Sequence, residues 1–83
     1  MKEKVEKIER VIDKIILALE DKVNKSTEDV DKRIYHSDIN KMKEWKLKVY
    51  DVYNDEDLRD RIKDDMLTTY LEMFENTLKI TIR

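Results

Sequence analysis

The chain has 83 residues, of which 40% are hydrophobic and 46% charged, with a net charge of −2 and no glycine, proline or cysteine. The absence of cysteine excludes a disulfide framework and thiolate metal sites, and the absence of glycine excludes glycine-rich phosphate-binding loops. Tight hairpin turns favour glycine, so the composition predicts an all-α fold: one domain over residues 1–83, built as a small bundle of three or four amphipathic helices.

Ala18 is the only alanine, although alanine is the best helix former. Alanine, glycine and proline share GC-rich codons, so their scarcity is typical of AT-rich genomes, such as those of many viruses and mobile elements. The longest apolar run, Ile15 to Leu19, is far too short to cross a bilayer, and charged residues interrupt every early apolar stretch. We therefore expect an intracellular protein without a signal peptide, in the cytoplasm of the producing or host cell.

The first predicted helix runs from about Lys2 to Asn24. Its apolar residues recur at steps of three and four, which places them on one helix face. They are Val5, Ile8, Ile12, Ile15, Leu19 and Val23, with Val11 and Ile16 beside them. Leu17 alone falls on the opposite face, so we expect its side chain to be exposed.

Residues 24–27 predict a break in the helix, where Ser26 or Thr27 is suited to cap a short second helix. The apolar face of the first helix nevertheless continues through Val30. A single helix that reaches Tyr35 is therefore the alternative.

The polar residues His36 to Asp38 predict a turn, with Ser37 or Asp38 as the cap of the next helix. This helix is expected to run from about Asp38 to Tyr53. Its apolar face contains Ile39, Met42, Trp45, Val49, Val52 and Tyr53. Because Trp45 shares this face, we expect its ring to be buried.

The acidic stretch Asn54 to Asp57 predicts the start of the last helix, with Asn54 or Asp55 as its cap. The helix is expected to run from about Glu56 to Leu78. From Met66 onwards its apolar residues cover an arc of about 220°, which is wider than one neighbouring helix buries. Its C-terminal half is therefore expected to be either central in the bundle or an interface. The candidate interface residues are Leu67, Tyr70, Leu71, Phe74 and Leu78.

Residues 78–83 alternate apolar and polar positions and include β-branched side chains. The pattern has two interpretations: a helix end that frays, or a short strand-like tail that pairs with another chain. The frayed helix end is the favoured one.

The candidates for catalysis and metal binding are weak. His36 is the only histidine, and the consecutive residues His36 to Asp38 cannot converge as the members of a catalytic triad do. Asp57, Asp60 and Asp64 share a helix face that could hold Mg²⁺, but basic residues are interleaved with them, which favours a solvated face. We expect no catalytic residue, no metal site and no cofactor, and hence no enzyme.

The best nucleic-acid candidate is the lysine-rich helix over residues 38–53, because basic residues with interleaved aromatic rings can bind phosphates and stack bases. Its lysines are Lys41, Lys43, Lys46 and Lys48. Residues 39–53 have a charge balance of +2 and residues 54–77 a balance of −5. The lysines flank the apolar stripe on both sides, which favours a core helix with a solvated face.

The sequence thus favours a non-enzymatic protein-protein interaction module, a small accessory or regulatory protein such as an inhibitor, an immunity-type protein or an assembly adaptor. A chain this small buries little apolar surface by itself, so we also expect a homo-oligomer. One alternative is a small helical DNA-binding regulator that uses residues 38–53, and another is a structural component of an oligomeric assembly. We expect another protein as the partner, with no nucleic acid and no membrane.

Overall fold

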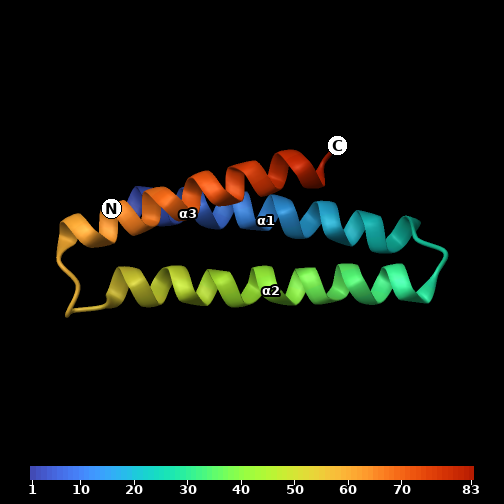
Figure 1. Ribbon diagram of the computed structural model, residues 1–83, viewed down its shortest axis with the longest axis horizontal. Coiled ribbons are helices and arrows are strands. Elements are labelled where there is room, and N and C mark those ends of the chain that lie inside the picture. Colours follow the sequence, from blue (N-terminus) through green and yellow to red (C-terminus); the bar gives the residue numbers. More distant parts are fainter.

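The computed structural model describes residues 1–83 and contains three helices: α1 (Lys2–Lys25), α2 (Asp29–Asn54) and α3 (Asp60–Thr81). Helices account for 87% of the chain and there is no strand, so the predicted all-α bundle is confirmed. Figure 1 shows that α2 runs back along α1 and that α3 then follows the direction of α1. The bundle is long and thin, with extents of 47 × 21 × 14 Å.

α1 is the central helix of the bundle. It packs along both other helices, whereas α2 and α3 contact each other much less. Of the ten residues in the buried core, α1 supplies six, while α2 and α3 supply two each. The core is formed by Val5, Ile8, Val11, Ile12, Ile15, Leu19, Ile39, Val49, Leu67 and Phe74. The apolar stripe of the first predicted helix is therefore the main source of the core.

α3 ends before it reaches the loop that joins α1 to α2 (Figure 1). The first turns of α2 therefore have α1 on one side and no third helix on the other. Val30 and Ile34 lie in these turns, and both are exposed. This end of the molecule is a two-helix hairpin, which is too thin to bury apolar side chains completely.

The predicted turn at His36 to Asp38 is wrong, because α2 continues without interruption through these residues. His36 and Ser37 are exposed, so they occupy the polar face of a long amphipathic helix. Polar residues that could cap a helix are equally compatible with its solvated face when no glycine or proline forces a stop.

The predicted break at residues 24–27 is confirmed, since α1 ends at Lys25 and α2 begins at Asp29. The predicted caps are wrong. The N-cap residue of α2 is Glu28, and its side chain makes no capping hydrogen bond. The Ser26 hydroxyl instead donates to the backbone carbonyl of Lys22, 2.7 Å away, and so belongs to the end of α1.

The last helix begins later and ends later than predicted, at Asp60 and Thr81. Asp55 does not cap it. Its carboxylate accepts the backbone N–H of Asp57 at 2.9 Å and stabilises a turn in the loop between α2 and α3. The strand-like tail is wrong, because residues 78–81 continue the helix and the Thr81 hydroxyl donates to the backbone carbonyl of Thr77.

Candidate protein-interaction surface

The five candidate interface residues of α3 fall into two groups. Leu67 is 0% exposed and Phe74 1%, so both side chains belong to the core of the chain itself and are not accessible to a partner. Tyr70, Leu71 and Leu78 are half-buried and pack against this core. α3 lies at the edge of the bundle, so only part of its wide apolar arc faces α1. The arc is thus divided into a buried part and an exposed part.

A second row of residues, which includes the exposed part of the arc, runs along α3. We call this row the outer stripe; it contains Ile62, Met66, Thr69, Met73, Asn76 and Ile80. Ile62 is 46% exposed, Met73 39% and Ile80 68%. Met73 lies about 120° around the helix from Leu67, which explains why residues on the same helix differ so much in exposure.

The outer stripe was only partly found in the sequence. Met66 and Met73 lie within the apolar arc that was predicted from Met66 onwards, but Ile62 precedes that arc. Ile80 lies in the segment that was predicted to be a frayed end or a tail. The steps of four and three residues along the outer stripe were the available signal, and they become visible only once the helix is known to continue through Lys79 and Ile80.

An aromatic cluster joins α2 to α3 in the middle of the bundle. The Trp45 ring meets Tyr70 and Phe74 edge-on, with ring centroids 5.3 Å and 5.4 Å apart. Trp45 is half-buried rather than buried, because α1 does not cover its outer side. The Lys48 ammonium lies 4.8 Å from the centre of the Trp45 ring and shields that side in a cation–π contact.

A shallow groove of about 240 Å³ lies beyond this cluster, between α2 and α3. Its lining consists of Ile15, Leu19, Asp38, Lys41, Met42, Thr77 and Thr81. The groove is open to one side and is smaller than the sites that usually enclose small ligands, which measure about 300–1,000 Å³. Asp38 and Lys41 are the charged residues of its lining.

The four candidate lysines do not form one basic patch. Lys46 forms an ion pair with Asp13 of α1 at 2.8 Å, and Lys48 lies over Trp45. Lys41 lines the groove, while Lys43 is exposed on the other flank of α2. Their positive charges are therefore divided between two sides of the helix, and one of them is neutralised within the chain.

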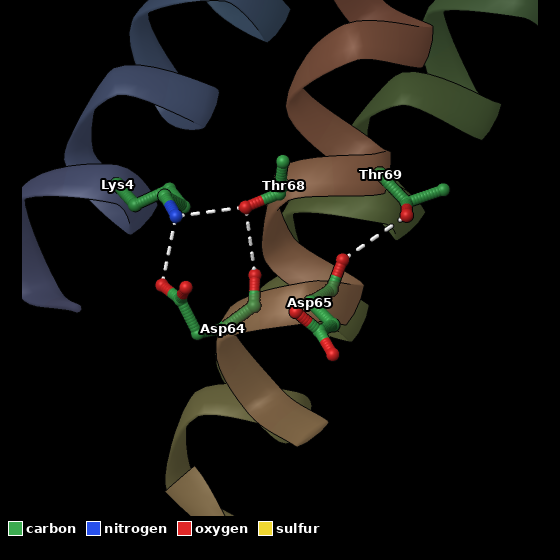
Figure 2. Close-up of polar contacts among 5 residues, drawn as sticks. All are labelled: Lys4, Asp64, Asp65, Thr68 and Thr69. Atoms are coloured by element: carbon green, nitrogen blue, oxygen red, sulfur yellow. Dashed lines mark hydrogen bonds and ion pairs between the residues drawn. The ribbon is translucent and has the colours of Figure 1, made fainter. Parts of the chain in front are cut away.

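A polar contact joins the N-terminal ends of α1 and α3. Figure 2 shows the Lys4 ammonium between the Asp64 carboxylate and the Thr68 hydroxyl, each 2.7 Å away. The Thr68 hydroxyl in turn donates to the backbone carbonyl of Asp64. The hydrogen bond from Lys4 and its positive charge lower the pKa of Asp64, against a smaller opposing effect of desolvation. This carboxylate therefore has a structural role in positioning α3 along α1.

Tyr50 of α2 is the other residue whose pKa differs from its ordinary value. Its hydrogen bond with Glu9 raises the pKa of the phenol, and desolvation and the negative charges of Glu9 and Glu6 act in the same direction. Tyr50 of α2 and Glu9 of α1 therefore lie near each other.

No group of three or more histidine, aspartate or glutamate side chains lies close enough together to hold a metal ion. The Asp64 carboxylate forms an ion pair with Lys4, while Asp57 lies in the loop before α3. His36 lies exposed in the N-terminal third of α2. None of the helices has an apolar segment of the length needed to cross a membrane.

The chain matches no known protein family, no curated protein and no solved structure.

Proposed function

We propose that this protein is a non-enzymatic protein-interaction module that docks the outer stripe of α3 on a protein partner. The observation that carries the proposal is the division of α3, in which the core face is buried while Ile62, Met73 and Ile80 stay exposed. Rows of large apolar side chains on a monomer's surface are typical of protein-protein contacts.

The shape of the surface supports a helix as the contacting element. Residues at alternating steps of four and three form the seam along which two helices pack. Met66 and Met73 lie in this seam, and unbranched, polarisable methionine side chains adapt well to a partner surface. Within this proposal the protein acts inside cells as an inhibitor, an immunity-type protein, an assembly adaptor or a structural component of an assembly, since each of these roles can be carried by such a docking surface.

A DNA-binding role has less support. Phosphate contacts require a concentrated basic surface, and here the lysines of α2 are divided between two flanks. Lys46 is paired with Asp13, and Lys48 is held against Trp45. A membrane-surface role would require a uniformly basic polar face, and the polar faces of these helices mix acids and bases.

Site-specific photo-cross-linking tests the proposal. A photoreactive amino acid is introduced at Met73 in one variant and at Leu17, which is 65% exposed on the far side of α1, in a matched variant. In cells of the organism that encodes the protein, we expect protein adducts from position 73 and none from position 17. Equal adducts from both positions, or none from either, would contradict the proposal.

A further inference from the structure

The outer stripe of α3 has the spacing of a coiled-coil seam. Its six residues follow one another at steps of four, three, four, three and four, as the a and d positions of a heptad repeat do. All six are at least partly exposed. The core face of α3 already packs within the bundle, so this seam lies ready for one further helix.

The chain exposes more surface than an average folded protein of its mass, by an amount similar to the area that one standard interface covers. A folded protein of 10.2 kDa exposes about 5,300 Å². This chain exposes 6119 Å², which is about 800 Å² more. In a standard protein-protein interface each partner buries about 800 Å².

We propose that the occupant of this seam is a second copy of the chain, with α3 packed antiparallel against α3 of the partner about a two-fold axis. The proposal rests on the proposed function, since it names the partner of the same surface. In this register Ile62 lies opposite the partner's Ile80, Met66 opposite the partner's Asn76, and Thr69 opposite the partner's Met73. A two-fold interface repeats each of these contacts, so the large residues at both ends of the stripe meet each other.

The charges beside the stripe select the antiparallel arrangement. Asp65, Glu72 and Lys79 each precede a stripe residue, on the flank away from α2. Antiparallel packing places Asp65 opposite the partner's Lys79, twice by symmetry, and brings Glu72 beside the partner's Glu72 at the axis. None of the three forms an ion pair within its own chain, in which the paired acids are Asp13, Asp21 and Asp64.

A parallel arrangement lacks this complementarity. It would place Asp65 beside the partner's Tyr70 and Glu72 beside the partner's Thr77. Tyr70 already packs on Trp45 of α2, and Thr77 lines the groove between α2 and α3. Opposite charges therefore meet only when the two α3 helices run in opposite directions.

Sedimentation equilibrium with the full chain from about 5 to 500 μM tests the proposal. We expect a concentration-dependent dimer. Asp65→Lys should raise its dissociation constant about 10-fold, because two attractive pairs become repulsive. The double variant Asp65→Lys, Lys79→Glu should return it to within about threefold of the wild-type value, since the pairs are re-formed with exchanged signs.

Two matched controls separate this interface from general effects of charge and apolarity. Glu20→Lys makes the same charge change on an exposed residue of α1, and Leu17→Glu places an acid on the far side of α1; both should leave the dimer unchanged. Met73→Glu should abolish it with helicity retained. Glu72→Gln should lower the dissociation constant severalfold, because it removes the like charges at the axis.

A dimer that the double variant fails to restore would overturn the antiparallel α3 interface. A wild-type chain that is monomeric throughout the range would overturn the second copy as occupant. If position 73 then still cross-links to a different protein and position 17 does not, the proposed function stands while this inference falls. If position 73 cross-links to nothing, both fall.

Discussion

α1 and α3 are both amphipathic helices with large apolar side chains, but they differ in how many of these side chains are buried. The stripe of α1 lies between two helices, and six of its residues are buried, while Leu17 is exposed on the opposite face. The apolar arc of α3 is as rich in large side chains, yet only Leu67 and Phe74 are fully covered. The position of a helix in a three-helix bundle thus decides how much of its apolar surface stays available. The helix at the edge keeps a surface that a partner can use.

The largest expected effect separates the two faces of α3 at neighbouring residues. Phe74→Ala should lower the free energy of unfolding by about 3–5 kcal/mol, because it leaves a cavity in the core beside Trp45. Met73→Ala should cost less than about 1 kcal/mol, because its side chain already contacts water. Urea denaturation at a protein concentration that keeps the chain monomeric measures both. Similar losses for the two variants would contradict the division of α3.

The same contrast can be tested within α1. Ile12 is fully buried between the other helices, and Ile12→Ala should cost about 2–5 kcal/mol. Leu17→Ala lies on the opposite face and should change the free energy of unfolding by no more than about 0.5 kcal/mol. Thermal unfolding followed by circular dichroism gives both values. A large loss of stability in Leu17→Ala would mean that the far side of α1 is also covered. Leu17 would then be invalid as a control position.

Most of the fold was predictable because helix formation depends on local spacing. The stripe of α1 follows directly from apolar residues at steps of three and four, and the break near Ser26 was located correctly. The turn at His36 was wrong because residues suited to a cap are equally suited to a solvated helix face. Sequence patterns indicate which residues can end a helix, but the packing of α2 along α1 decides that α2 continues through His36.

The surface was harder to predict than the fold. The width of the arc after Met66 indicated an interface or a central helix, but it did not say which of its residues would be exposed. Leu67 and Phe74 were grouped with Tyr70 as interface candidates, although burial depends on the direction from which α1 approaches. That direction is a long-range property, which periodicity along one helix does not contain.

A smaller effect is expected where α2 and α3 meet. Tyr70→Leu keeps an apolar side chain but removes one edge-to-face contact with Trp45, which should cost about 1 kcal/mol. Because the half-buried tryptophan loses a neighbour, its fluorescence should shift to longer wavelength and iodide should quench it more. Tyr35→Leu removes a tyrosine at the two-helix end of the bundle and should leave the emission unchanged. Equal spectra for Tyr70→Leu and the wild type would show that the aromatic cluster does not shield Trp45.

The smallest effect concerns the contact that joins the start of α1 to α3. Lys4 lowers the pKa of Asp64 in the folded state, so the folded chain holds this proton less tightly than the unfolded chain does. The resulting stabilisation is present above the unfolded pKa of about 3.9 and is lost as the pH falls through the lower folded pKa. Lys4→Met keeps most of the side-chain stem but removes the charge. Its urea midpoint should therefore fall less steeply than the wild-type midpoint on acidification below about pH 5.

Lys2→Met removes the same charge from an exposed residue that has no ion pair, so it should follow the wild-type profile. Parallel pH profiles for Lys4→Met and the wild type, or an Asp64 carboxyl that titrates at its ordinary value by NMR, would mean that α3 is positioned along α1 by packing alone.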